Sequence, residues 1–150
     1  MKEAFKGYLE KPYEAYAILK KVKSELEKIF ETVDFGFLEY GYLQKAQPDT
    51  VIITPISDNF SSRGISMQNQ LKTNSISFSI NLIVEDVFDE EGFDKFMAQR
   101  FAVLDVVTNK EVIHKKISDV QVVSEFVNDS DVMAITEFYI CTMNVTMQLL

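Results

Sequence analysis

The segment "NSISFSINLIVE" (residues 74–85) carries the clearest structural signal in the chain. Apolar side chains occupy every second position from Ile76 to Val84, and the positions between them are mostly Ser or Asn. This period of two predicts a β-strand with one apolar face and one small, polar face. A strand with one polar face fits an antiparallel sheet better than a parallel sheet that is buried on both sides.

A second strand is predicted upstream, in the β-branched run "TVIITPI" (residues 50–56), where Pro55 favours a sheet edge or a bulge. Between the two strands lies "SDNFSSRGISMQNQLKTNS" (residues 57–75), which is too polar for a core and too long for a tight turn. We expect an extended loop over residues 58–73. Loops of this length are usually functional or disordered. Such a segment can also extend as a β-hairpin arm that adds to the sheet of a neighbour.

Residues 12–33, "PYEAYAILKKVKSELEKIFETV", predict a helix, because Pro12 fits a first turn and apolar residues recur at three- and four-residue steps. The expected core-facing stripe is Tyr16, Leu19, Val22, Leu26, Ile29 and Val33. The aromatic-rich residues 34–49 fit either a short strand or an irregular packed segment.

A second amphipathic helix is predicted after the acidic residues 89–91, since negative charge favours a helix N-terminus. It runs to about Thr108, and Asn109 can end it in a left-handed conformation. Its expected apolar residues are Phe93, Phe96, Met97, Phe101 and Leu104. Two more strands follow at residues 117–127 and 135–148, joined by the turn "NDSD" (residues 128–131).

The expected fold is therefore α+β, with the element order α-β-β-α-β-β in a single domain over residues 1–150. An antiparallel or mixed sheet of about four strands would carry the two helices on its apolar face. The opposite face, rich in Ser, Thr and Asn, would be left for solvent or a neighbour. Residues 1–11 are expected to form an extra turn or an N-terminal arm, in which Phe5 and Tyr8 are apolar contacts.

Catalytic and metal chemistry have few candidate residues in this chain. Cys141 is the single Cys and His114 the single His, which leaves too few ligands for a zinc site built from these residues. The acidic residues 85–94 lack the spacing of a calcium loop, because Phe88 occupies the third position counted from Asp86. No phosphate-binding, dinucleotide-binding or nucleophile-elbow motif occurs. We therefore predict no enzyme activity, no catalytic or metal-binding residues and no cofactor.

The formal net charge of −8 is unevenly distributed over the 150 residues. Residues 1–33 are slightly basic, whereas the remainder is strongly acidic. An acidic body is a poor nucleic-acid clamp, because phosphate binding needs a dense Lys and Arg surface. The start of the chain lacks the apolar region of a secretory signal, and no apolar run approaches the length of a membrane helix. We expect no membrane contact, and a place in the cytosol or in a particle assembled there.

Taken together, these segments resemble the tail terminator (tail completion) proteins of tailed bacteriophages. The resemblance covers most of residues 12–148 and lies in size, element order and texture: the helix "AYAILKKVKSELEKIF", the strand "VIITPI" with its long loop, "ISFSINLIVED" before "GFDKFMAQRFAVLDVV", and the closing pair "ISDVQVVSEFV" and "TEFYICTMNVTMQ".

The resemblance implies a structural virion protein that assembles in the host cytoplasm and forms a homo-hexameric ring. Such a ring caps the tail tube, ends its polymerisation and joins it to the neck or head–tail connector protein. DNA passes through the lumen without specific binding, and the tail tube protein is the other partner. The family supplies no catalytic residues.

The loop side chains expected to grip a neighbouring subunit or the tail tube are Phe60, Arg63, Ile65, Met67 and Leu71. Phe60 and Leu71 could equally pack back on their own domain. Three alternatives stay open: another phage neck or baseplate component of similar fold, a non-viral scaffold protein, and a small-ligand-binding α+β module. In the last case the pocket would lie between sheet and helices and be lined by Tyr40, Phe93, Phe96 and Tyr139.

Overall fold

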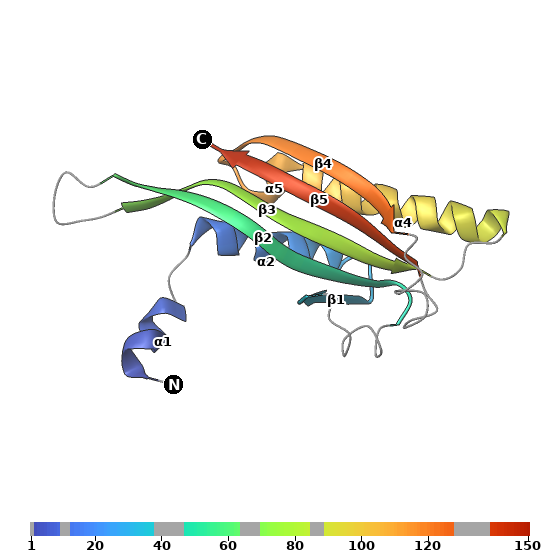
Figure 1. Cartoon of the computed structure of the whole chain (residues 1–150), viewed down its shortest axis with the longest axis horizontal. Coiled ribbons are helices and arrows are strands. Elements are labelled where there is room, and N and C mark those ends of the chain that lie inside the picture. The colour runs from blue at the N-terminus through green and yellow to red at the C-terminus, as the bar shows by residue number, and fades with distance from the viewer. Residues whose placement is uncertain (1, 10–12, 38–46, 64–69, 85–88, 128–138) are drawn as a thin grey trace.

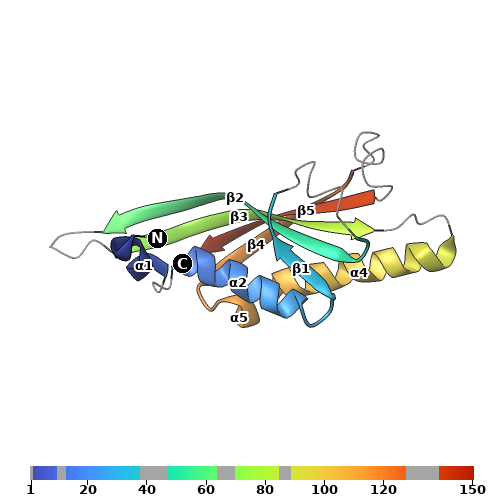
Figure 2. The same cartoon turned by 90° about the horizontal axis from the view of Figure 1, so that it is seen from below.

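The computed structural model describes residues 2–9, 13–37, 47–63, 70–84, 89–127 and 139–150. A five-stranded mixed sheet with the order β1-β2-β3-β5-β4 carries helices on one face (Figures 1 and 2). The elements are α1 (Glu3–Leu9), α2 (Glu14–Leu26), β1 (Thr32–Phe35), β2 (Thr50–Arg63), β3 (Gln70–Val84), α4 (Glu90–Thr108), α5 (Lys110–Ile113), β4 (Ile117–Val127) and β5 (Tyr139–Leu149). The predicted α+β class and single domain are confirmed, although the described sheet has five strands, not four.

The core lies between the sheet and helices α2 and α4. The alternation predicted for β3 is confirmed, because Ile76, Phe78, Ile80, Leu82 and Val84 are all buried in this core. β5 pairs antiparallel with β3 and supplies the adjoining row of buried side chains, which are Cys141, Met143, Val145 and Met147. The two central strands thus form the apolar floor on which the helices pack.

Helix α2 ends earlier than predicted and buries a different stripe. Its core-facing residues are Ala15, Ile18, Val22 and Leu26. Tyr16 and Ile29, which were expected in the core, are each 51% exposed. The chain turns after Leu26 because the β-branched Thr32 and Val33 belong to a strand, whose backbone hydrogen bonds go to β2 and not to a helix.

Strand β1 settles the structure of the first residues of the ambiguous segment 34–49. It runs parallel to β2, with Thr32 opposite Thr50 and Phe35 opposite Ile53. Asp49 starts β2 from a left-handed conformation with φ 64°, which Asp tolerates better than most residues. The Asp49 carboxylate accepts hydrogen bonds from Gln99 (2.6 Å) and Lys95 (3.0 Å), so this turn is tied to α4.

The extended loop predicted over residues 58–73 is wrong for residues 58–63 and 70–73, which are strand. β2 and β3 pair antiparallel as far as Arg63 and Gln70, with register shifts between Pro55 and Ser57 and between Asn59 and Phe60. The polar residues are accommodated because the ladder satisfies their backbone groups. Side chains also bond across the pair, from Ser61 to Asn74 and from Asn74 to Asn59, each at 3.2 Å.

This part of the hairpin extends beyond the core, and we call residues 57–63 and 70–75 the arm. The register between β3 and β5 begins at Ser75, so residues of β3 before Ser75 pair with β2 alone. Figure 1 shows the ends of β2 and β3 running past α2 and past the end of β5. Of the two forms considered for this segment, the structure therefore has the β-hairpin.

Helix α4 begins at the predicted acidic cluster, where the Asp89 side chain caps it by accepting from the Gly92 N–H at 2.6 Å. It buries Phe96, Val103 and Val107. Asn109 does not adopt the expected left-handed conformation, since its φ is −80°, and the chain continues directly into α5.

Helix α1 occupies the segment predicted as an extra turn or an N-terminal arm. None of its residues is buried. Figure 1 shows it standing away from the sheet, at the end of the molecule where the arm projects.

Candidate partner-binding surfaces

An apolar groove lies where the arm meets the start of α2, and we call it the arm groove. Its volume is about 400 Å³, and its walls are Tyr13, Ala15, Tyr16, Leu19, Asp58, Phe60 and Leu71. A neighbouring groove of about 350 Å³ shares Ala15, Leu19 and Asp58 and continues to Phe37, Pro55 and Ile56. Since both grooves are open to solvent and mostly apolar, they suit contact with another polypeptide.

The predicted interface residues Phe60 and Leu71 come together in this groove. They lie on the α2 side of the arm and remain 38% and 56% exposed. Both therefore line their own domain and still present apolar surface outward. The Arg63 backbone closes the described part of the hairpin opposite Gln70, whereas Ile65 and Met67 lie outside the described residues.

Several groove residues were missed from the sequence. Tyr16 was assigned to the core stripe, Tyr13 lay in the predicted helix but outside its stripe, and Phe37 lay in the ambiguous segment 34–49. Ile56 is exposed because the register shift between Pro55 and Ser57 interrupts the alternation of β2. The Pro within an apolar run was the one available signal for such an irregularity.

A second exposed apolar surface runs along α4, and we call it the α4 stripe. Phe93, Met97 and Phe101 follow each other at four-residue steps, and Phe93 and Phe101 are 50% and 67% exposed. Beside them, at the sheet edge, Phe126 of β4 packs edge-on against Phe96 with ring centroids 5.6 Å apart. Of the three α4 phenylalanines predicted to face the core, Phe96 is buried, whereas Phe93 and Phe101 are on the surface.

Arg100 of α4 contacts two residues of β4 and so links the helix to the sheet edge. Its guanidinium lies 5.4 Å from the Phe126 ring centroid, and its Nε donates to the Ser124 hydroxyl at 3.0 Å. Among the described residues, Arg100 forms no ion pair. The contact holds the sheet edge against the helix, because a planar guanidinium can stack and donate at once.

The polar face of the sheet contains a buried hydrogen-bond network centred on Asn81, which is 1% exposed. The Asn81 amide nitrogen lies 3.3 Å from the Ile52 carbonyl, 3.3 Å from the Thr54 hydroxyl and 3.2 Å from the Ser79 hydroxyl. The Thr142 hydroxyl donates to its carbonyl oxygen at 2.9 Å. The expectation that this whole face is left for solvent or a neighbour is therefore wrong at this end.

Other residues on this face confirm that it has two parts. Three isoleucines of β2, β3 and β5 are also buried there: Ile52, Ile83 and Ile140. Towards the arm, Ser77 and Thr146 are partly exposed and bond to each other at 3.2 Å. Only this second part remains open to a partner.

The two residues considered for catalysis or metal binding, Cys141 and His114, make contacts within the fold. Cys141 is buried in the core, and the His114 Nδ1 accepts from the Lys116 N–H at 3.2 Å in the turn before β4. Among the described residues, no group of three or more acidic, His or Cys side chains could hold a metal ion. Of the four residues named for a pocket between sheet and helices, Phe96 is buried in the core, Phe93 is exposed, and the Tyr40 and Tyr139 side chains lie outside the described residues.

Burial raises the pKa of the Cys141 thiol above its usual value of 9.0. The unfolded chain therefore ionises at lower pH than the folded one, so this contribution to stability is present below pH 9 and is lost as pH rises. We expect the wild-type free energy of unfolding to fall relative to Cys141→Ala above pH 9, by at most about 1.4 kcal/mol per pH unit. Denaturant titrations of both proteins at several pH values measure this, and a constant difference would contradict it.

Comparisons with known proteins assign no relative, since no protein-family model and no curated protein matches the chain. Within the described residues, no helix combines the length and the apolar character needed to span a membrane.

Proposed function

We propose that the protein is a structural subunit of a tailed-phage particle that acts as a tail terminator. In this role it forms a ring, which caps the tail tube, ends its polymerisation and joins it to the neck. The observation that carries the proposal is the arm, a two-stranded extension whose apolar side chains Phe60 and Leu71 stay exposed. An extension of this kind needs a partner to cover it, because an isolated β-ribbon is marginally stable in water.

Unpaired strand edges support the assembly role. β4 lies at one edge of the described sheet, and β2 has no β1 partner beyond Ile53. Exposed edges of this kind pair readily with a strand from another chain. The two edges belong to different strands, so contacts between them would be head-to-tail, and head-to-tail contacts generate rings when the rotation closes.

The charge distribution supports passage of DNA without specific binding. The net charge of −8 disfavours a phosphate-binding surface, so a ring of this chain would let a duplex slide. A homo-hexamer with tail tube and connector proteins as partners, located in the virion after assembly in the host cytoplasm, completes the proposal.

The arm offers a direct test. Replacing residues 62–71 by Asn-Gly joins Ser61 to Lys72, which face each other in the register, through a two-residue hairpin turn. We expect the variant to keep the unfolding transition of the wild type, because the buried residues of β2 and β3 lie outside the deletion. We also expect it to lose rings in electron micrographs and to lose binding to tail-tube ends.

The matched control is Ser62→Ala, which changes an exposed arm residue and leaves the hairpin intact. It is expected to assemble normally. If the shortened protein formed rings and capped tubes like the control, the arm would be dispensable and the proposed role would lose its support.

A further inference from the structure

The α4 stripe has a charged border on one side only. Glu90 lies three residues before Phe93, Asp94 lies three before Met97, and Asp105 lies four after Phe101. Side chains at these spacings are neighbours on a helix surface, so the three carboxylates flank the stripe. Within the described part of the chain, none of the three forms an ion pair. The α4 stripe is therefore complementary to a ligand that has an apolar centre and basic groups along one side.

Helix α1 has the complementary pattern. Phe5, Tyr8 and Leu9 lie at three- and four-residue spacings on one face, and Phe5 and Leu9 are 52% and 62% exposed. Lys6 borders this face one turn before Leu9, and Lys2 precedes it by a further turn. The Lys6 amine contacts Glu3 at 2.8 Å, but this pair is exposed and contributes little.

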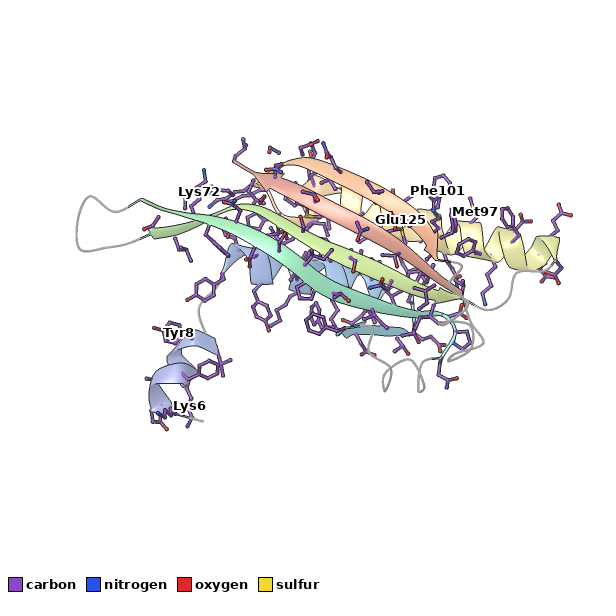
Figure 3. All side chains as sticks on the ribbon, in the orientation of Figure 1. Lys6, Tyr8, Lys72, Met97, Phe101 and Glu125 are labelled. Carbon is purple, nitrogen blue, oxygen red and sulfur yellow. The ribbon has the colours of Figure 1, made fainter. Side chains whose placement is uncertain are left out.

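The two surfaces of one chain cannot meet each other. Residues 10–13 alone connect α1 to α2, and so short a linker spans about 18 Å at most. Figure 3 shows Lys6 and Tyr8 at the arm end of the molecule, whereas Met97 and Phe101 lie on the part of α4 toward the opposite end. An α1 helix that covers the α4 stripe must therefore come from a different copy.

We propose that α1 of one copy docks onto the α4 stripe of the next copy. Phe5 and Leu9 cover Met97 and Phe101, which are likewise one helical turn apart, while Lys2 and Lys6 face Asp94 and Asp105. The contact is head-to-tail, because each copy contributes its α1 at one end and binds the α1 of another copy on its α4 stripe. It deepens the proposed function by supplying a subunit contact of the ring, and it rests on that function only for the closure into a ring.

A helix of seven residues makes a small contact, so a single docking event is weak. In a closed ring every copy gives and receives one helix, and linked contacts strengthen one another. A test should therefore trap the contact covalently and should not depend on its affinity alone.

The test uses the full chain with Leu9→Cys and Phe101→Cys, oxidised without denaturant so that the native Cys141 stays buried. We expect disulfide-linked dimers and longer ladders, resolved on a non-reducing gel. The competing arrangement is tested with Leu9→Cys and Leu71→Cys, because α1 could instead fill the arm groove beside it. Efficient linkage within a single copy of this second variant, without ladders in the first, overturns the proposal.

Charge reversal supplies an independent readout. In the cysteine background, Lys2→Glu with Lys6→Glu is expected to lower the ladder yield about fivefold, the effect of losing roughly two rim ion pairs. Adding Asp94→Lys and Asp105→Lys to the same chain is expected to restore it. The proposed pairing is overturned if the two Lys→Glu substitutions leave the ladder yield unchanged. It is also overturned if the added Asp→Lys substitutions fail to restore a lowered yield.

The same samples separate this inference from the proposed function. Rings that cap tail tubes while Leu9 never links to Phe101 would refute the α1 contact and leave the terminator role intact. Ladders and rings that never bind a tube end would refute the terminator role and leave the contact intact.

Discussion

Phe78→Ala is expected to lower the free energy of unfolding by about 3–5 kcal/mol. Phe78 is the largest fully buried side chain of the residues that the structure describes, and it lies in the middle of β3, opposite Pro55 of β2 and Val145 of β5. Its removal loses the apolar surface buried by the ring and leaves a cavity that the paired strands cannot close by moving. A loss of this size is a large part of the stability of an ordinary domain. Urea titration followed by circular dichroism measures it.

The matched control for this substitution is Phe101→Ala, measured at low protein concentration. Phe101 is 67% exposed, so its truncation is expected to change the free energy of unfolding by less than about 0.5 kcal/mol. Equal losses for the two variants would mean that the packing of β3 against the helices is not the main source of stability.

Asn81→Asp is the second large effect, expected to cost about 3–5 kcal/mol at neutral pH. The substitution keeps the shape of the side chain but replaces the amide donor with a carboxylate oxygen. That oxygen then faces the Ile52 carbonyl, which the amide nitrogen approaches to 3.3 Å in the wild type. The Thr142 hydroxyl still donates to the other carboxylate oxygen, but a buried charge without a cationic partner is strongly unfavourable, and repulsion from the Ile52 carbonyl adds to the cost.

The pH dependence of Asn81→Asp has a definite sign. Burial raises the pKa of the new carboxyl in the folded state above its unfolded value of about 3.9. The folded state therefore retains the proton, so the variant is least impaired below about pH 4 and loses stability as pH rises. Asn144→Asp is the control, since Asn144 lies on the same face of β5 but is partly exposed. A similar cost for both variants at pH 7 would contradict the role of burial.

The central sheet could be predicted because β3 and β5 each bury one face completely, which imposes a period of two on their residues. β1 could not, since four residues are too few to show a period, and its pairing with β2 is decided by contacts between segments. The end of α2 was misplaced for a related reason. Val22 and Leu26 belong both to the predicted stripe and to the observed one, so spacing alone does not determine which flanking residues are buried.

The candidate surfaces were only partly predictable. Phe60 and Leu71 stand out as apolar residues within a polar segment, and both do line the arm groove. The strand character of the arm was hidden because a ribbon outside the core needs no apolar alternation, and its one buried position, among the described side chains, is the polar Thr73. The α4 stripe was missed for the opposite reason, since Phe93 and Phe101 look like core residues until the helix is oriented on the sheet.

The position of β5 between β3 and β4 has a consequence for how the chain folds. β4 precedes β5 in sequence, but its ladder is formed with β5, and contacts such as Asn81 to Thr142 join residues 61 positions apart. The β2–β3 hairpin can therefore form first, while one edge of β3 stays unpaired until β5 is inserted. Such non-local pairing is slow. It leaves the unpaired edge of β3 exposed for longer, and an unpaired edge can pair with a strand of another chain. Refolding yield should accordingly fall as protein concentration rises.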